Sequence, residues 1–311
     1  MYQIIVNPNC GSGHGNRKWL NLKELLDLAK MTYIVYKTKS AKDVTRYTRK
    51  TTDKSLYENK ATANHLLLLG GDGTLNHCIN GIDDLEHTTI TYLPSGSAND
   101  FSRALGITQD PLKAVYALGK NGKTKRIDLG NVLYDTKKVR FAVSAGIGYD
   151  AAVCREVLHS PLKPYFNKIG LGRLIYGAIA LKQFITLRPC GCDLWLDDDD
   201  PIHFDTFLLA AFMNLKYEGG GFPFAPDADP DDGLLDICLV GNLPKIMVPF
   251  VLPFVFMGKH YGKPGVHHYR AKKIRITTEK PLFTHTDGEV IGKHNELTIT
   301  CGEEKLFYRK K

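Results

Sequence analysis

Cysteine is scarce in the 311-residue sequence, which contains only seven cysteines. An odd number of cysteines cannot all pair, and only Cys190 and Cys192 lie close together. One intervening residue is not the spacing of about two to four residues that zinc knuckles use. The pattern therefore excludes a zinc knuckle and predicts seven reduced thiols in a cytoplasmic protein.

Long apolar runs are also missing. The longest strongly apolar stretch, Ile246–Met257, contains Pro249 and Pro253 and has twelve residues, whereas a spanning helix needs about 20. The chain begins with the strand-like segment Tyr2–Asn7, without the basic and apolar regions of a signal peptide. We therefore expect a protein that does not cross a membrane.

Charge of one sign is in modest excess, since 41 Lys and Arg against 33 Asp and Glu give a formal net charge of +8. Hydrophobic residues make up 43% and charged residues 24% of the chain, which excludes general disorder. At roughly 150 residues per domain the length suggests two domains. A basic surface favours anionic partners, namely nucleotides, nucleic acid or acidic lipid headgroups.

Strands and helices alternate in the first third of the sequence. Apolar segments at Ile4–Val6, Tyr33–Tyr36, Leu66–Leu69 and Ile90–Leu93 predict strands, and helical patterns lie between them. Ser40–Asp43 predicts a capping box that begins one of these helices. This order predicts a doubly wound α/β domain with parallel strands.

The pattern changes at the basic stretch Lys120–Lys125, which we interpret as a linker. The following chain is rich in predicted strands, at Ile127–Tyr134, Val139–Ala145, Cys192–Leu196, Phe204–Asn214, Leu234–Val240 and Ala271–Thr277. Helical stretches near 151–158 and 171–185 interrupt them. The sequence therefore predicts a second domain built on an antiparallel sheet.

Three glycine-rich or polar loops follow predicted parallel strands. Gly70–Thr74 has three glycines in four positions before a helix, an arrangement suited to binding phosphate. Asp72 within it could hold Mg²⁺, or accept a hydrogen bond from a ribose or from a neighbouring loop. Asn7–Gly13 and Pro94–Asp100 occupy the same position after other strands, so all three loops should meet at one sheet edge.

Two other segments partly match nucleotide-binding motifs, but each lacks a residue that its motif requires. Gly122–Thr124 has the ending of a Walker A loop, but Ala117 stands at its first glycine position. Gly146–Ala151 matches the relaxed dinucleotide fingerprint, yet no acid occurs between Glu156 and Asp193, where the ribose partner should lie. We interpret Gly146–Ala151 as a structural turn.

Two acidic segments remain. Asp227–Asp236 has five acids in ten residues but fails the calcium-loop template, so a Mg²⁺ or Ca²⁺ site and a solvated turn both stay open. Thr286–Glu289 places two carboxylates around a glycine; one could act as a base while the other binds metal or orients it, or the segment is a hairpin turn. His285 and His294 nearby are expected to be surface histidines.

Taken together, these motifs resemble the soluble bacterial diacylglycerol kinase-like lipid kinases, with the diacylglycerol kinase catalytic domain. The resemblance spans nearly the whole chain and rests on Asn7-Pro8 with Gly11 and Gly13, Gly70–Asn76, Pro94–Phe101, Pro226–Ala228 with Asp232-Gly233, Gly258–His260 and Asp287–Glu289. It implies an α/β plus mainly-β fold: an N-terminal, phosphofructokinase-like nucleotide domain and a C-terminal β-sandwich. The expected domains are 1–125 with a C-terminal return at 293–311, and 126–292.

The resemblance also implies site residues, with ATP in the cleft between the domains. Phosphate-binding positions would be Asn7, Gly11, Ser12, Gly13, Thr38, Gly70, Gly71, Asp72, Gly73, Thr74 and Ser97. Asp229, Asp232 and the Leu234 carbonyl would hold a structural Mg²⁺. Asp72, Asp287 and Glu289 would be catalytic, with Glu289 as the base. Ser97 stands where the family usually has Thr, and His77 where many members have Glu.

The function implied is ATP-dependent phosphorylation of diacylglycerol to phosphatidic acid. Ceramide, a sphingoid base or monoacylglycerol are alternative substrates, and NAD kinase or a silent lipid- or nucleotide-binding regulator are further alternatives. The NAD kinase loop has Asn-Glu where this chain has Asn99-Asp100. Expected partners are ATP, Mg²⁺ and a lipid at the membrane surface, without nucleic acid, and a homodimer is left open. The segments 171–185 and Ile246–Met257 either contact the membrane or pack in the core, and we expect the protein at the inner membrane face.

Overall fold

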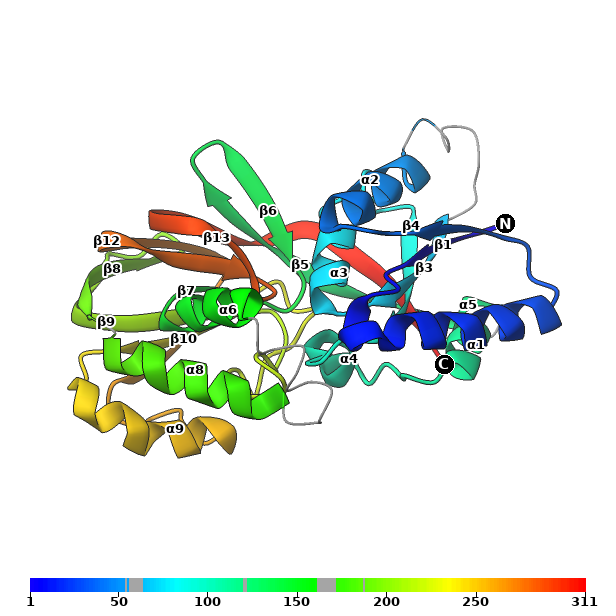
Figure 1. Cartoon of the computed structure of the whole chain (residues 1–311). Helices are drawn as coiled ribbons and strands as arrows, with labels where there is room; N and C mark the ends of the chain where they lie inside the picture. Colours follow the sequence, from blue (N-terminus) through cyan, green and yellow to red (C-terminus); the bar gives the residue numbers. More distant parts are fainter. Residues whose placement is uncertain (54, 56–63, 120–121, 161–171, 187) are drawn as a thin grey trace. The chain divides into compact units, whose positions relative to one another are not determined.

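The computed structural model describes residues 1–311 except 54, 56–63, 120–121, 161–171 and 187. The chain forms two compact units (Figure 1). The first comprises Met1–Ile127 with the C-terminal segment Glu304–Lys311, and the second comprises Asp128–Glu303. The chain therefore ends in the unit where it began.

The first unit alternates strands and helices along the chain. Its elements are β1 (Tyr2–Val6), η1 (Cys10–Gly13), α1 (His14–Leu28), β2 (Tyr33–Lys37), α2 (Ala41–Thr51), β3 (Asn64–Gly70), α3 (Asp72–Ile79), β4 (Thr88–Pro94), α4 (Asp100–Leu105) and α5 (Pro111–Leu118). The predicted capping box is confirmed at the start of α2, where Ser40 and Asp43 exchange backbone–side-chain hydrogen bonds of 3.2 Å.

Parallel pairing joins the strands of this unit in the order β13-β4-β3-β1-β2, with only the end of β13 (Glu289–Lys310) taking part. Alternate residues of β1 and β3 face opposite sides. Ile4 and Leu67 pack in a core cluster with Trp19 and Leu22 of α1. α1 and α5 cover one face, and α2 and α3 pack together on the other (Figure 1).

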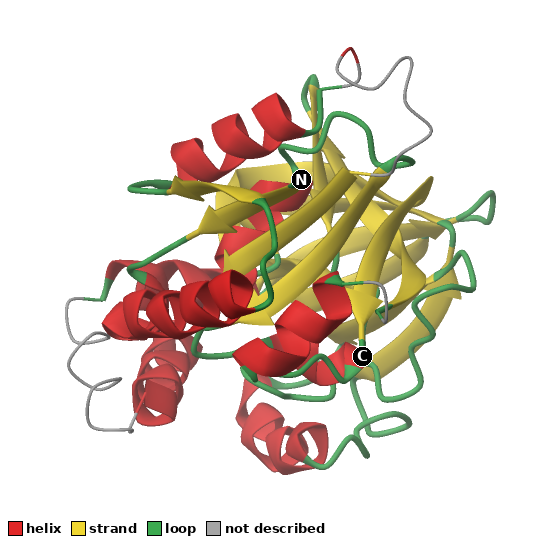
Figure 2. Ribbon diagram, turned by 90° about the vertical axis from the view of Figure 1, so that its right-hand side faces the viewer, coloured by secondary structure: helices red, strands yellow, loops and turns green. Residues whose placement is uncertain are grey.

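The second unit is rich in strands. Figure 2 shows the strands of the whole chain in yellow. Its elements are β5 (Lys123–Tyr134), which begins in the first unit, β6 (Lys137–Phe141), β7 (Ser144–Gly148), α6 (Tyr149–His159), α8 (Gly172–Thr186), β8 (Cys190–Leu196), β9 (Ile202–Met213), β10 (Leu235–Gly241), η3 (Lys245–Met247), α9 (Val248–Phe256), β11 (Val266–Ala271), β12 (Lys273–Thr286) and most of β13.

Two long strands organise this unit. β9 pairs with β8 through its first half and with β7 through its second, and β12 divides itself between the same two partners. These pairings are all antiparallel, as predicted from the sequence. The resulting closed path surrounds a core that includes Phe141, Phe207, Phe212 and Ile276.

Several predicted boundaries were wrong. Lys123–Lys125 begins β5 instead of forming a linker, while residues 120–121 lie outside the described part. The predicted strand Val139–Ala145 is two strands, because Ala142 and Val143 separate β6 from β7. Gly146 lies within β7, and only Gly148, with φ of 103°, turns the chain into α6.

No disulfide joins any of the seven cysteines, all of which lie in the described part of the chain; Cys154 is partly buried and the other six are buried. Among the described residues, no helix combines the length and the apolar character required to span a membrane.

Candidate functional site

Three loops of the first unit meet at one edge of its sheet, as the sequence predicted. β1, β3 and β4 run in parallel, and their register places Val6 beside Leu69 and Gly70 beside Pro94. Each loop begins at the carboxyl end of its strand, where open α/β sheets bind ligands.

The Gly70–Thr74 loop needs its glycines because the chain is crowded there. A Cβ on Gly70 would lie 2.4 Å from the Thr74 Cβ, and a Cβ on Gly96 would lie 2.7 Å from the Gly71 Cα. Two loops therefore pack backbone against backbone. α3 begins at Asp72, so its first N–H groups lie at this edge, where they favour an anion.

One of the roles that the sequence left open for Asp72, a hydrogen bond to a neighbouring loop, is present in the structure. Its carboxylate accepts hydrogen bonds from the backbone N–H groups of Asp100 (3.3 Å) and Phe101 (3.4 Å) at the start of α4. Asp72 thus ties the Gly70–Thr74 loop to the Pro94–Asp100 loop.

The first loop is joined to the other two. Asn7 Nδ2 donates to Thr74 Oγ1 at 2.9 Å. Gly11 has a φ of 58°, and a Cβ there would lie 2.3 Å from the Ser95 carbonyl oxygen. Gly11, Ser12 and Gly13 belong to η1, immediately before α1. These contacts hold the three loops as one surface.

Two predicted phosphate-binding side chains differ in accessibility. Ser97 is exposed at a turn that Asn99 closes with two hydrogen bonds to Gly96 of 2.9 Å each. Thr38 is only 3% exposed, and its hydroxyl donates to the Val6 carbonyl at 3.2 Å. In this structure Thr38 holds the end of β2 against β1.

Sequence reasoning missed Lys18 on α1. Its ammonium donates to the Pro94 carbonyl at 2.7 Å, so a half-buried cation lies at the joined loops. Burial lowers the pKa of Lys18, although nearby Cys10 opposes the shift. Only the helical position of Lys18 after a glycine-rich loop could have indicated this placement.

A separate hollow of about 610 Å³ lies along α2. Basic side chains line it, among them Lys42, Arg46, Arg49 and Lys50, together with His77 of α3. None of the predicted phosphate-binding residues lines this hollow.

In the second unit, Thr286–Glu289 forms a tight hairpin turn between β12 and β13. Asp287 (φ 48°) and Gly288 (φ 81°) are both left-handed, as in a two-residue type I′ turn. The Asp287 carboxylate accepts hydrogen bonds from the backbone N–H groups of Ala142 (3.1 Å), Val143 (2.8 Å) and Ser144 (3.1 Å). Asp287 thus organises the break between β6 and β7, while Glu289 is half-buried next to it.

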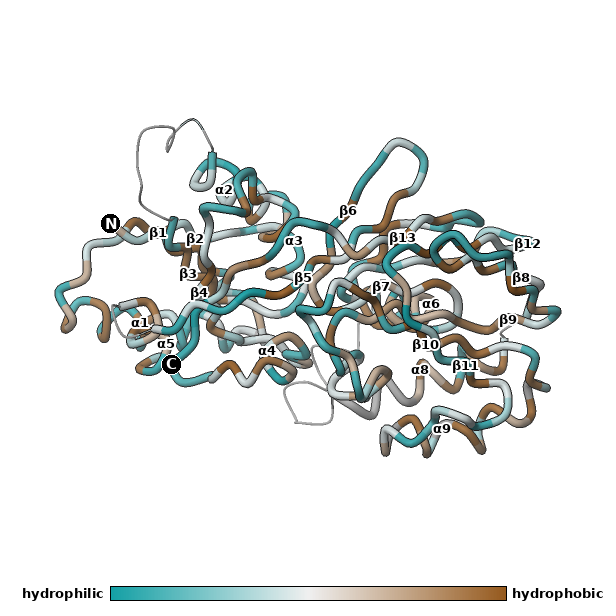
Figure 3. The backbone as a smooth tube through the Cα atoms, turned by 180° about the vertical axis from the view of Figure 1, so that it is seen from behind, coloured by the Kyte–Doolittle hydropathy of each residue, from teal (hydrophilic) through white to brown (hydrophobic). Residues whose placement is uncertain are grey.

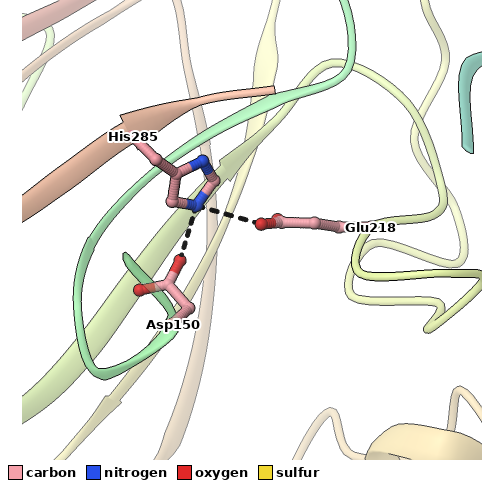
Figure 4. Close-up of side chains that lie close together, drawn as sticks. All are labelled: Asp150, Glu218 and His285. Atoms are coloured by element: carbon pink, nitrogen blue, oxygen red, sulfur yellow. Dashed lines mark hydrogen bonds and ion pairs between the residues drawn. The ribbon is translucent and has the colours of Figure 1, made fainter. Parts of the chain in front are cut away.

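The prediction that His285 lies on the surface was wrong. His285 is fully buried, and its Nε2 lies 3.0 Å from a carboxylate oxygen of Asp150 and 3.0 Å from one of Glu218 (Figure 4). The sequence pattern could not show this, because the two acids are 135 and 67 positions earlier in the chain. His294 is only partly buried and packs 4.3 Å from the Tyr134 ring centroid.

The acidic loop has partners within the protein. Asp232 forms an ion pair with Arg270 and accepts a hydrogen bond from the Leu234 N–H at 3.0 Å. Asp229 accepts from the Asp231 N–H at 3.2 Å. Oxygen ligands of this kind suit Mg²⁺. The Asp232 carboxylate thus has a partner on each oxygen within the protein, and Asp229, Asp232 and the Leu234 carbonyl stay the predicted ligands.

Three joined loops on a parallel sheet, followed by a strand-rich unit that carries carboxylates, define a two-unit protein of the α/β plus β type. The particular family follows from comparison with known proteins. Residues 1–132 match the family model of the diacylglycerol kinase catalytic domain, and residues 142–302 match that of the YegS C-terminal NAD kinase beta sandwich-like domain. The chain belongs to this family of diacylglycerol kinase-like lipid kinases.

Individual relatives of this chain are also named as lipid kinases. A Bacillus subtilis protein named "Putative lipid kinase YtlR" is 29% identical over 93% of both chains. A diacylglycerol kinase of Mycobacterium tuberculosis H37Rv is 30% identical over 72% of this chain and 70% of its own. A crystal structure from Bacillus anthracis str. Sterne, described as a "putative diacylglycerol kinase", shares the fold with a TM-score of 0.74 and 24% identity, covering 100% of this chain and 95% of that one.

Proposed function

We propose that this lipid kinase transfers the γ-phosphoryl group of ATP to the hydroxyl of diacylglycerol, giving phosphatidic acid and ADP. The observation that carries the proposal is the joined set of three loops at the carboxyl ends of β1, β3 and β4. The names of the relatives support the lipid.

The joined loops would bind the ATP phosphates. Backbone N–H groups of Gly70–Thr74 and of Gly11–Gly13 would donate to phosphate oxygens, with Ser97 adding a hydroxyl. Lys18, which lies at the joined loops, would supply positive charge, since the chain has no Walker lysine. Mg²⁺ would arrive with ATP and neutralise the phosphates, as phosphoryl transfer generally requires.

Glu289 would act as the general base. The lipid hydroxyl oxygen attacks the γ-phosphorus, the bond from that phosphorus to the bridging oxygen breaks, and ADP leaves. The hydroxyl proton passes to the Glu289 carboxylate as the new bond forms. Asp287 cannot take this role easily, because its carboxylate already accepts three backbone hydrogen bonds.

The protein would work as a peripheral protein at the cytoplasmic face of an anionic membrane. Val251 of α9 packs in a core cluster, whereas Phe250 and Ile246 beside it are 66% and 76% exposed. Brown segments mark this apolar stretch in Figure 3. The net charge of +8 would add attraction to acidic headgroups, worth about 1 kcal/mol per basic residue near the surface.

We infer that the first unit is a doubly wound, phosphofructokinase-like nucleotide domain and that the second is a β-sandwich. Parallel pairing with helices on two faces supports the former. The closed antiparallel path of β9 and β12 supports the latter.

A substrate panel tests the function. Purified protein is given ATP and Mg²⁺ with diacylglycerol, ceramide, sphingosine or monoacylglycerol in mixed micelles, and with NAD in solution. We expect the highest kcat/KM with diacylglycerol. Preferred phosphorylation of another lipid would show that this lipid, and not diacylglycerol, is the substrate. NADP formation would favour a NAD kinase. A folded protein that binds ATP without turnover would favour a regulator.

A further inference from the structure

Three segments of the second unit bring a histidine and two acids together in the interior (Figure 4). His285 lies near the end of β12, Asp150 in the first turn of α6, and Glu218 in the loop after β9. Their side chains are 0%, 10% and 9% exposed. We call Asp150, Glu218 and His285 the buried triad.

Gly146 leaves the space that the buried triad occupies. It pairs with His285 across β7 and β12. A Cβ at position 146 would lie 1.9 Å from Asp150 Oδ2 and 2.4 Å from His285 Nε2. A side chain there would expel the triad, so this part of the molecule is built around it.

The second nitrogen of the imidazole faces the hairpin turn. The Gly288 N–H donates to His285 Nδ1 at 3.1 Å, and Gly288 immediately precedes Glu289. Because Nδ1 accepts this hydrogen bond, it carries a lone pair, and the imidazole proton resides on Nε2. Nε2–H therefore points toward the two carboxylates.

A single donor, the Nε2–H group, cannot satisfy the hydrogen-bonding capacity of two buried carboxylates. Within 3.5 Å, Asp150 Oδ1 and Glu218 Oε2 accept no hydrogen bond among the described residues, although the Ser144 hydroxyl interacts with the Glu218 carboxylate. Burying two uncompensated negative charges is expensive, so a second proton on the cluster is favoured. Burial raises the pKa of Glu218, although His285 opposes the shift. Burial lowers the pKa of His285, but Cys154, Glu218 and Asp150 raise it more. Because the donating Gly288 N–H leaves no place for a proton on Nδ1, the second proton belongs on the carboxylates.

A divalent metal is the other chemistry that an imidazole and two carboxylates can support. Such an ion needs the lone pair of Nε2, which moves the imidazole proton to Nδ1. Nδ1–H would then face the Gly288 N–H, donor against donor. The contact to Gly288 therefore favours a proton over a metal ion.

We propose that His285 is a positioning residue, which holds the Gly288 N–H and thereby sets the backbone of Glu289, while a proton held between Asp150 and Glu218 keeps the imidazole in its accepting tautomer. This inference rests on the proposed function of Glu289 as the base. His285 touches neither ATP nor lipid in this role.

Two variants of similar size test the contacts of the two imidazole nitrogens, Nδ1 and Nε2, one at a time. In His285→Asn the side-chain oxygen takes the place of Nδ1 and still accepts from Gly288. In His285→Gln the side-chain amide reaches the place of Nε2, and the acceptor for Gly288 is lost. We expect His285→Gln to lower kcat at least tenfold with an unchanged KM for ATP, and His285→Asn to keep kcat within about threefold. His294→Gln, at a partly buried histidine outside the triad, is the matched control and should keep kcat.

Equal kcat values for His285→Asn and His285→Gln would overturn the inference, as would stoichiometric divalent metal in the wild type that His285→Asn loses. Glu289→Gln is measured alongside. If it keeps full kcat, the proposed base is wrong; if it loses activity while the His285 variants behave alike, only the positioning role fails.

If the His285 variants do not fold, the variant Glu218→Gln tests whether the triad holds the additional proton. A raised folded-state pKa stabilises the protein below the ordinary carboxyl value, and this contribution is lost as pH rises through the folded value. Wild-type kcat and Tm should therefore fall on the alkaline side with an ionisation that Glu218→Gln lacks. Two cysteines also interact with the triad. Burial raises the pKa of Cys238 to about 12. Cys154 on α6 is present in both the wild type and Glu218→Gln, so its ionisation does not distinguish them. The same alkaline limb in both proteins would overturn the inference.

Discussion

Asp287 and Glu289 stand two residues apart, yet the structure gives them different tasks. Asp287→Ala removes a carboxylate that accepts three backbone hydrogen bonds of 2.8–3.1 Å. It also places alanine at a φ of 48°, which side chains rarely adopt. We therefore expect Asp287→Ala to act mainly on stability, and Glu289→Ala mainly on activity.

The size of the stability loss follows from these contacts. A hydrogen bond to a charged group contributes about 1.5–3 kcal/mol, but three bonds to one half-buried carboxylate are not additive and are partly replaced by water. We take about 3 kcal/mol for the loss. For units of this size, 1 kcal/mol changes Tm by about 2–4 °C, so Tm should fall by about 6–12 °C.

Thermal unfolding and amide hydrogen exchange measure the effect. In Asp287→Ala, exchange at Ala142, Val143 and Ser144 should accelerate, because their N–H groups lose their acceptor. Asp287→Asn, which keeps an oxygen acceptor and tolerates the left-handed backbone, should lose less. Glu289→Ala should keep Tm within about 2 °C. Unchanged Tm and unchanged exchange at residues 142–144 in Asp287→Ala would refute this division of roles.

Three further predictions test other parts of the molecule. Lys18→Met should raise the KM for ATP about tenfold, corresponding to about 1.4 kcal/mol, and Lys18→Arg less; an unchanged KM would remove Lys18 from the phosphate site. EDTA should leave the wild-type Tm unchanged because Arg270 already neutralises Asp232; an EDTA-induced fall that Asp232→Ala abolishes would restore the structural metal. Phe250→Glu on α9 should weaken binding to anionic vesicles at least tenfold, whereas Leu112→Glu, at a similarly exposed apolar residue (57%), should not; equal binding would exclude α9 as the membrane contact.

Local patterns made much of the first unit predictable. A glycine loop after four leucines marks a strand, a sharp turn and a helix in sequence order, and the structure places β3, Gly70–Thr74 and α3 there. Ser40–Asp43 specified its helix start in the same local way. The meeting of three loops followed from parallel pairing, which is a rule of topology rather than of individual contacts.

Contacts between distant segments were not predictable. His285 was placed on the surface because a histidine beside a turn has no local partner. Its partners Asp150 and Glu218 come from a helix and a loop that only the folded sheet brings together. Asp287 likewise finds its donors about 145 residues earlier in the chain. The strand boundary at Ala142 lies where that carboxylate accepts its hydrogen bonds, so spacing alone could not reveal it.

Phosphoryl transfer from labelled ATP to diacylglycerol, by the wild type and by Glu289→Gln, tests the central claim most directly. We predict labelled phosphatidic acid from the wild type. Glu289→Gln should lose at least about a hundredfold in kcat, the usual contribution of a general base, with ATP binding and Tm unchanged. The account would be contradicted by a folded, ATP-binding wild type that labels no lipid, or by a Glu289→Gln variant that works at the wild-type rate.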